Sequence, residues 1–295
     1  MTTPVLEVLH QRHPSARIDI LAGPQSAALF EHCPYRGQIW RMARQASVWE
    51  RLTLIRELRR QRYELIVDLR TDGLAYLLRA RKRRTRWEAG DRKRLPHDVE
   101  RQAAIFDPAL TRTALGTPKI WLSTEIQDRA RLHLSRLPGA RWLALAPGAN
   151  WEPKCWPVDR FVEMTHAVPA EFDGFLLLGG PDDAERARVL AAQIRGPCLN
   201  LAGETDLLLA AAVLAQASAF VGNDSGLGHL ASAVGTPSLT VFGPGEPERF
   251  HPWGPKANWI IAPGRDLSQL SGARVAEGLR AHLARLQLTP EPKPA

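Results

Sequence analysis

A four-residue turn, Asn-Asp-Ser-Gly at residues 223–226, holds the side chains best suited to chemistry in this 295-residue chain. It lies between a short apolar run and a helical pattern over residues 227–234. The N–H groups that begin such a helix have no partner within it, and together with the helix dipole they favour a bound anion. The Ser225 hydroxyl can donate a hydrogen bond to that anion, and Gly226 lets a ligand approach the backbone closely.

Asp224, in the same turn, suits a different chemical group. A carboxylate repels a plain phosphate, but it accepts hydrogen bonds from sugar hydroxyls. The turn therefore favours a ligand that carries both an anion and hydroxyl groups. The alternative is that Asp224 or Ser225 only caps the helix that follows.

Lys154 is the second candidate, because it lies in a loop after a buried-type strand at residues 142–146. A flexible cation at this place can neutralise a departing diphosphate. The alternative is an ordinary solvated surface lysine. Its neighbour Cys155 is interpreted as a filler residue rather than a nucleophile, and Trp156 as a packing residue.

Alternating strand and helix patterns must position these residues, and they predict an α/β fold built on parallel sheets. The predicted helices are residues 4–13, 23–30, 49–60, 72–80, 96–106, 125–137, 158–167, 184–194, 207–216, 227–234 and 271–286. The predicted strands are residues 17–22, 39–40, 63–68, 142–146, 175–180, 199–201, 219–222, 238–242 and 258–261. We expect an N-terminal domain over residues 1–122, whose end from 108 is a linker, and a C-terminal domain over 123–295. The final helix is expected to pack back on the N-terminal domain.

The composition is that of a globular protein without a membrane span, since 44% of the residues are hydrophobic and 24% charged. No apolar run approaches the roughly 20 residues that a span needs, and residues 1–4 do not resemble a signal peptide. Three widely separated cysteines show no metal-binding spacing and favour a reducing compartment. A formal net charge of +8 points to an anionic partner.

Much of that charge lies in residues 79–94, which contain nine basic residues and two acidic ones, Glu88 and Asp91. Such a density suits phosphate-rich ligands or an anionic membrane surface. Four of these residues are the candidates for contacting an acceptor or a membrane: Arg81, Lys82, Arg83 and Arg84. No nucleic-acid-binding motif accompanies the run, so nucleic acid is not the expected partner. A solvated arginine-rich loop is the alternative.

Residues 219–254 resemble the signature of glycosyltransferase family 9, the lipopolysaccharide heptosyltransferases, usually written D-[ST]-G-x-x-H followed by F/Y-G-P-T-x-P. The matching residues are Asp224, Ser225, Gly226, His229, Gly235, Pro237, Phe242, Gly243, Pro244 and Pro247. Ala231 matches the family's alanine with a shift of one position, and Gly245 replaces the usual Thr. A second family motif, P-G-A-x-x-x-x-K-x-W-P-x-x-x-F, is matched by Pro147, Gly148, Ala149, Lys154, Trp156, Pro157 and Phe161.

The resemblance implies a GT-B architecture, in which two Rossmann-like domains face each other across a cleft. It implies inverting transfer of a heptose from ADP-heptose to a lipopolysaccharide core or lipid A precursor, without a cofactor or an essential metal. Lys154 and Asp224 are then the catalytic candidates. The donor-binding candidates are Pro147, Gly148, Ala149, Asn150, Asp182, Ser225, Gly226, Leu227 and His229. Asp182 would contact the ribose or only favour a helix start, and His229 would contact phosphate or be a buried core histidine. The expected location is the cytoplasm, peripheral on the inner face of the inner membrane.

The family also has a strand and a Gly-Asp loop before the Thr-Pro-Val-Leu motif at residues 3–6, and that loop carries the Asp proposed as catalytic base. We expect the chain as given to lack both, through a late start or a truncation, and to bind an ADP-sugar but transfer it poorly. A shorter natural variant is the alternative. Asp68 and Asp72 are substitutes by position at the end of a strand, although Asp72 also suits a helix cap.

Two other function classes stay open at this point. A degenerate binding protein would hold the nucleotide without turnover, and a sugar-nucleotide epimerase of the same fold would convert the donor without an acceptor. A dehydrogenase is disfavoured, because no G-x-G-x-x-G follows a first strand.

Overall fold

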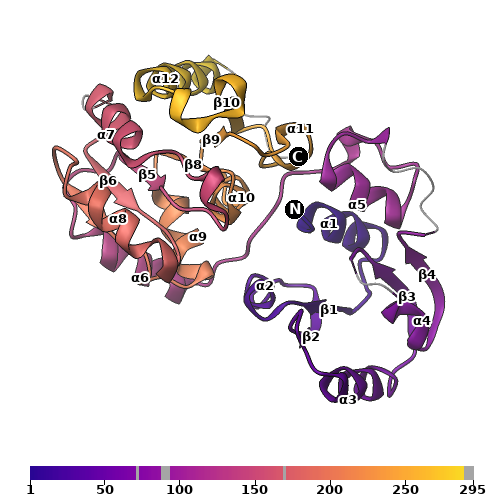
Figure 1. Cartoon of the computed structure of the whole chain (residues 1–295). Coiled ribbons are helices and arrows are strands. Elements are labelled where there is room, and N and C mark those ends of the chain that lie inside the picture. The colour runs from indigo at the N-terminus through magenta and orange to yellow at the C-terminus, as the bar shows by residue number, and fades with distance from the viewer. Residues whose placement is uncertain (71–72, 88–93, 169–170, 289–295) are drawn as a thin grey trace. The chain divides into compact units, whose positions relative to one another are not determined.

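The computed structural model describes residues 1–70, 73–87, 94–168 and 171–288 (Figure 1). The chain divides into two compact units, Met1–Gly116 and Thr117–Ala295, so the division falls within the expected linker. Each unit is described by itself below.

Unit 1 alternates short helices and strands (Figure 1). Its elements are α1 (Thr3–Arg12), β1 (Ile18–Ala22), α2 (Pro24–Ala28), β2 (Arg36–Arg41), α3 (Val48–Leu58), β3 (Tyr63–Asp68), α4 (Leu74–Leu77), β4 (Ala80–Thr85) and α5 (Asp98–Phe106). Strand β1 pairs in parallel with β2, and β3 pairs in parallel with β4, as two separate two-stranded sheets. Helix α1 packs on α5. A small apolar cluster of Leu54, Leu58 and Leu78 lies under α3.

One helix prediction in unit 1 is wrong, because only the four-residue α4 forms within the helix predicted at residues 72–80. The arginine-rich run, for which no strand was predicted, begins with strand β4. The run was missed as a strand because arginine and lysine have no preference for strands, and pairing with β3 overrides that.

Unit 2 is a doubly wound α/β unit (Figure 1). Its main elements are α6 (Thr124–Leu134), β5 (Trp142–Ala146), α7 (Val158–Ala167), β6 (Gly174–Leu177), α8 (Ala184–Ala191), β7 (Cys198–Asn200), α9 (Leu207–Gln216), β8 (Ala219–Asn223), α10 (Gly226–Ala233), β9 (Ser238–Phe242), α11 (Pro247–Phe250), β10 (Ala257–Ile261) and α12 (Gly272–Leu288). Six strands form one parallel sheet in the order β10-β9-β8-β5-β6-β7.

The central strands explain why this sheet is all parallel. All residues of β8 and β9 are buried, as are the last four residues of β5. Strands covered by helices on both faces need continuous apolar runs rather than alternation. Helix α9 is apolar on nearly every side and buried from Leu208 to Leu214. Helix α12 packs on α7, β9 and β10.

The strand order creates a topological switch point between β5 and β8. From β5 the chain proceeds to β6 and β7 on one side, then returns to place β8, β9 and β10 on the other. In open α/β sheets, ligands bind outside the carboxyl ends of the strands at such a point. The loops after β5 and β8, which hold Lys154 and Asp224, begin there.

Candidate active site

Lys154 and Asp224 meet at the switch point. The Lys154 Nζ atom lies 2.6 Å from the Asp224 Oδ2 atom, although the residues come from the ends of different strands. The Lys154 side chain is 24% exposed and that of Asp224 only 9%, so the pair is largely withdrawn from water. The cation offsets the repulsion that Asp224 would exert on a phosphate, and both side chains are held close to where a ligand would bind.

Asn223 ties the two loops together, a role that was not predicted from the sequence. The residue is fully buried, and its Nδ2 atom donates to the Pro147 carbonyl at 2.8 Å and to that of Gly148 at 3.3 Å. Its Oδ1 atom accepts from the Trp156 backbone N–H at 3.0 Å. The sequence carried one indication of this role, an Asn at the end of an otherwise apolar strand. A buried side-chain amide needs hydrogen-bond partners.

Trp156 itself packs as expected. It is fully buried, its indole N–H donates to the Leu270 carbonyl at 2.9 Å, and its ring meets the edge of Phe161 at 4.7 Å between centroids. The loop after β5 is therefore anchored at both of its ends, with Lys154 between them.

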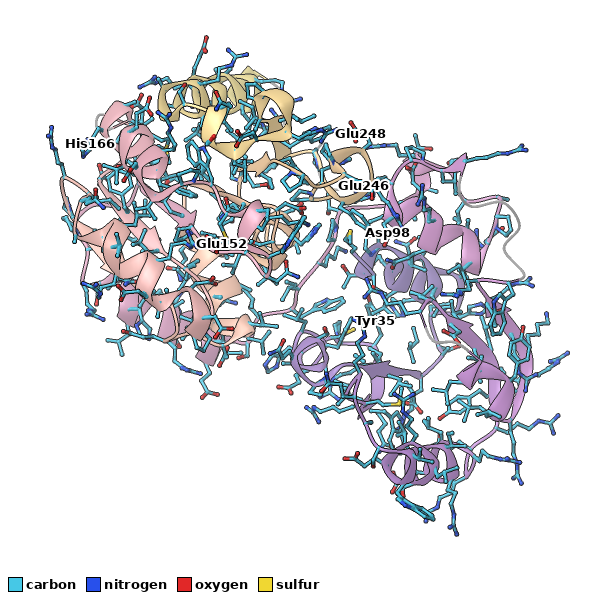
Figure 2. All side chains as sticks on the ribbon, in the orientation of Figure 1. Tyr35, Asp98, Glu152, His166, Glu246 and Glu248 are labelled. Atoms are coloured by element: carbon cyan, nitrogen blue, oxygen red, sulfur yellow. The ribbon has the colours of Figure 1, made fainter. Side chains whose placement is uncertain are left out.

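Glu152 fixes the middle of the same loop. The residue is labelled in Figure 2 and lies two positions before Lys154 in a short 3-10 helix. Both of its carboxylate oxygens accept from one guanidinium nitrogen of Arg186 on α8, at 2.6 and 2.7 Å. This attachment limits the positions that Lys154 can adopt.

Gly148 lies against an acidic residue that follows β6. A Cβ atom at Gly148 would collide with the Asp183 carboxylate, so this position admits no side chain in the present arrangement. Asp183 also accepts from the Gly180 N–H at 2.9 Å. Asp182, the predicted ribose ligand, is exposed, so Asp183 is the carboxylate that contacts the loop. Nearby, Pro147 is buried, Ala149 half-buried and Asn150 exposed.

Helix α10 presents its N-terminus at the same place. Ser225 is the N-cap residue by position, but its side chain makes no capping hydrogen bond. Its Oγ atom is buried and has no hydrogen-bond partner among the described residues. Since Asp224 pairs with Lys154, the simple capping interpretation fails for both residues. A buried hydroxyl without a partner is costly, and a ligand at the helix start would satisfy it. Gly226 is exposed, while Leu227 and His229 are half-buried in the first turn.

The loop after β9 closes against Asp224. A Cβ atom at Gly245 would lie 2.6 Å from the Asp224 Oδ2 atom, so a threonine at this position would require a shift of that carboxylate. Arg265 donates to the Gly245 carbonyl at 3.1 Å, and its own backbone adopts a left-handed φ of 64°. Such a conformation is costly for a residue other than glycine, and it occurs here where the side chain supports the loop.

The environment of Cys155 disfavours its thiolate form. Burial raises the pKa of the Cys155 thiol, which keeps it protonated at neutral pH and agrees with a filler role. Among the described residues, no group of three or more His, Cys, Asp or Glu side chains is arranged to hold a metal ion.

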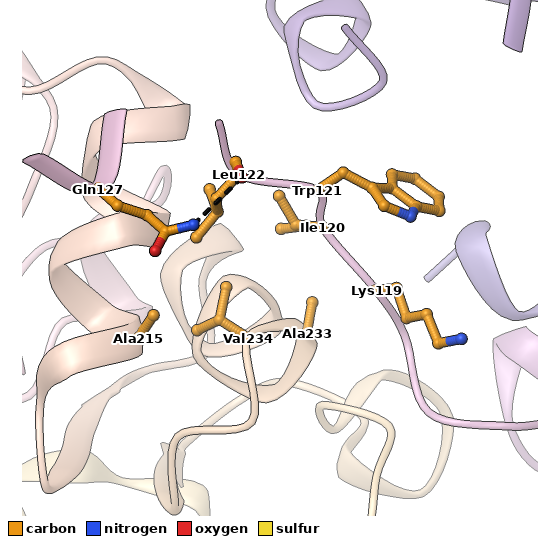
Figure 3. A pocket seen from close by; sticks show the side chains of 8 residues that line it. All are labelled: Lys119, Ile120, Trp121, Leu122, Gln127, Ala215, Ala233 and Val234. Atoms are coloured by element: carbon orange, nitrogen blue, oxygen red, sulfur yellow. Dashed lines mark hydrogen bonds between the residues drawn. The ribbon is translucent and has the colours of Figure 1, made fainter. Parts of the chain in front are cut away.

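A separate pocket of about 290 Å³ lies at the opposite end of α10 (Figure 3). Ala233 at the end of α10 and Val234 directly after it line the pocket, together with Ala215 and the chain segment around Trp121. Gln127 also lines it, and its side chain donates to the Leu122 carbonyl at 3.2 Å. It is therefore distinct from the site at the N-terminus of α10.

In unit 1, the four basic residues of β4 that were candidates for contacting an acceptor or a membrane differ in exposure and in hydrogen bonding. Arg81, Lys82 and Arg84 are exposed, and Arg81 lies 3.3 Å from the Glu64 carboxylate. The half-buried Arg83 instead donates to the backbone carbonyls of Ala75, Leu78 and Ala80, at distances of 2.7 to 3.3 Å. Arg83 therefore holds α4 and β4 together.

Asp68 ends β3 and is buried, with its Oδ1 atom accepting from the Arg70 N–H at 3.2 Å. Asp72, the other substitute for a base, lies outside the described residues. No helix within the described residues has the length and apolar character to cross a membrane.

Comparison with known proteins agrees with the motifs. Residues 51–273 match the family described as glycosyltransferase family 9 (heptosyltransferase). The chain is 26% identical to lipopolysaccharide heptosyltransferase 2 of Escherichia coli K12, over 99% of this chain and 91% of the relative.

Two solved structures support the same grouping. The structure of E. coli ADP-heptose lps heptosyltransferase II superposes with a TM-score of 0.78 at 26% identity, covering 97% of this chain and 95% of that one. E. coli heptosyltransferase WaaC with ADP has a TM-score of 0.76 at 22% identity, covering 95% of each chain, which shows likeness of fold. Because the family match spans well over half of its residues, the chain belongs to glycosyltransferase family 9 and is a glycosyltransferase of the GT-B fold.

Proposed function

We propose that this enzyme transfers a heptose from ADP-heptose to a lipopolysaccharide core or lipid A precursor, with inversion at the anomeric carbon. One observation carries the proposal: a Lys154–Asp224 pair at 2.6 Å lies beside the N-terminus of α10 and the unpartnered Ser225 hydroxyl. A cation, a helix start and a buried carboxylate at one point match a ligand that joins a diphosphate to a sugar.

The roles follow from charge. Lys154 and the first N–H groups of α10 stabilise the negative charge that develops on the departing diphosphate, and Ser225 donates a further hydrogen bond. Asp224 accepts hydrogen bonds from the heptose hydroxyls. We assign the ribose hydroxyls to Asp183 rather than Asp182, on the ground that the Asp183 carboxylate lies against the loop at Gly148.

Unit 1 is assigned to the acceptor. The exposed cations Arg81, Lys82 and Arg84 suit the phosphates of a lipid A precursor or of an anionic membrane on the inner face of the inner membrane. A base removes the acceptor hydroxyl proton. Asp68, the last residue of β3, is the candidate for this base.

The test supplies ADP-heptose with and without a heptose- or Kdo-bearing lipid A acceptor and measures ADP release. Release that depends on the acceptor, with an inverted anomeric centre by NMR, supports the proposal. ADP binding without release would indicate the degenerate binding protein. Conversion of the donor sugar without an acceptor would indicate the epimerase.

A further inference from the structure

Helix α3 of unit 1 is a well-formed helix with an unusual surface. Its N-cap, Ser47, accepts from the Glu50 N–H at 3.3 Å, and the Glu50 carboxylate accepts from the Ser47 N–H at 2.7 Å. This reciprocal capping box fixes the first turn. The apolar residues of that turn are therefore held in a defined place.

The two faces of α3 differ. Leu54 and Leu58 are buried in the apolar cluster. At about 100° per residue, Val48, Trp49 and Leu52 lie on the opposite face, and they are 69%, 79% and 45% exposed. Trp49 is more exposed than any other large apolar side chain among the described residues. An exposed apolar face of this kind marks an interaction site.

The surroundings of this face are strongly basic. Residues 41–62 contain seven arginines against Glu50 and Glu57. Arg56 falls on the apolar face itself, and Arg44, Arg59, Arg60 and Arg62 are exposed nearby in sequence. For these five arginines, no ion pair is found among the residues that the structure describes. Arg51 differs, because its guanidinium donates to the Ala46 and Arg44 carbonyls and secures the start of the helix.

We propose that α3 docks into the interface of an anionic lipid bilayer, with Val48, Trp49 and Leu52 at the boundary between headgroups and acyl chains. Tryptophan favours that boundary, and arginines beside apolar residues extend their charge to the lipid phosphates. A second copy of this chain is a poorer occupant, because it would bring two arginine-rich faces together. The proposal deepens the membrane association in the proposed function and rests on it for its biological setting, but its test requires no heptosyl transfer.

The experiment measures partition of the full chain onto phosphatidylcholine vesicles with and without phosphatidylglycerol. The variant Val48→Ser/Trp49→Ser/Leu52→Ser is expected to bind the anionic vesicles about tenfold more weakly. The matched control Leu132→Ser/Val189→Ser removes exposed apolar side chains from α6 and α8 and is expected to bind as the parent chain does. Arg56→Ser/Arg59→Ser should lose affinity only where phosphatidylglycerol is present.

A second measurement tests how deeply Trp49 enters the lipid bilayer. Brominated lipids should quench the tryptophan fluorescence of the parent chain, and Trp49→Phe should bind normally with clearly less quenching. Melting temperature and ADP affinity should stay unchanged in every variant, because the substituted side chains are exposed and none of them belongs to the candidate active site. Equal vesicle binding by the triple variant would overturn the proposal. So would a parent dimer that the triple variant abolishes without a change in vesicle binding, since α3 would then be a protein interface.

Discussion

At the scale of single residues, the central feature is a pair of opposite charges that is mostly shielded from water. Lys154 and Asp224 neutralise each other across 2.6 Å. Removing either partner leaves the other charge unpaired in a poorly solvated place, which costs roughly 1–3 kcal/mol of folding free energy. Loss of activity and loss of stability must therefore be measured separately.

Lys154→Ala and Asp224→Ala are each expected to lower kcat/KM for heptosyl transfer about a hundredfold, equivalent to about 3 kcal/mol of transition-state stabilisation. Each should also lower the free energy of unfolding. The double variant Lys154→Ala/Asp224→Ala should lose less stability than the two single losses added together, because no unpaired charge remains. Additive stability losses, or a kcat/KM near that of the parent in both single variants, would contradict the assigned roles.

Gly245 offers a second test of the same carboxylate. A methyl group there would lie 2.6 Å from the Asp224 Oδ2 atom and 3.1 Å from Phe242. Gly245→Ala should displace Asp224 from Lys154 and lower kcat/KM about tenfold, with the larger effect on kcat. Gly116→Ala is the control, because a Cβ atom there meets nothing within 4 Å. Unchanged kinetics of Gly245→Ala would mean that Asp224 does not need its present position.

The individual residues of the site could be predicted from the sequence more readily than the contacts between them. Lys154 and Asp224 stand in recognisable motifs, but nothing in their spacing reveals that they touch. Asn223 was missed because a single buried amide has no periodic signature. The choice between Asp182 and Asp183 depends on how one 3-10 turn is oriented, which helix propensity does not determine.

At the scale of elements, the apolar segments were the most predictable. The bounds predicted for α7, α9, β5 and β9 agree with the structure, because their apolar patterns are long or continuous. Strand β4 was missed, since five of the six residues in Ala80–Thr85 are polar or basic. Among the described strands it pairs only with β3, and such edges tolerate charged residues that discourage further pairing.

This strand allows a test that separates surface charge from structure. On β4, Lys82 and Arg84 are exposed, whereas Arg83 binds three carbonyls. Lys82→Ser/Arg84→Ser should weaken binding to the lipid acceptor or to anionic vesicles and leave ADP affinity and melting temperature unchanged. Arg83→Ser should instead lower the free energy of unfolding by roughly 1–3 kcal/mol. A loss of ADP affinity in the first variant, with lipid binding intact, would count against the acceptor role.

At the scale of the whole molecule, the strand order could not be derived from the sequence. Alternating helices and strands predict a parallel sheet, but they do not say which strands become neighbours. The order in unit 2 places β8 beside β5 and so brings together the two loops of the site. In unit 1, the same alternation does not reveal that the four strands form two separate pairs.

The stability of unit 2 should depend on pH through His282 of α12. The residue is buried, and this desolvation lowers the pKa of its imidazole below the ordinary value of 6.5, despite a hydrogen bond to the Lys256 carbonyl that raises it. The unfolded chain therefore takes up a proton at a higher pH than the folded chain, so stability is lost as pH falls below 6.5.

Urea unfolding at about pH 7.5 and about pH 5.5 checks this expectation. His282→Gln should reduce the decrease in the free energy of unfolding between the two values, because glutamine cannot take up the proton. An equal decrease in parent and variant would assign the pH dependence to other groups.

The return of the chain from β7 to β8 also affects how the protein folds. Leu143 of β5 pairs with Ala219 of β8, far along the sequence, so closing the centre of the sheet requires a long loop to be ordered first. Local helices such as α9 can form much earlier. In stopped-flow refolding, helical circular dichroism should therefore recover before the ability to bind ADP, which should appear only with the slowest major phase. During synthesis, the same distance along the chain means that β5 can pair with β8 only after the ribosome has released the chain beyond Asn223.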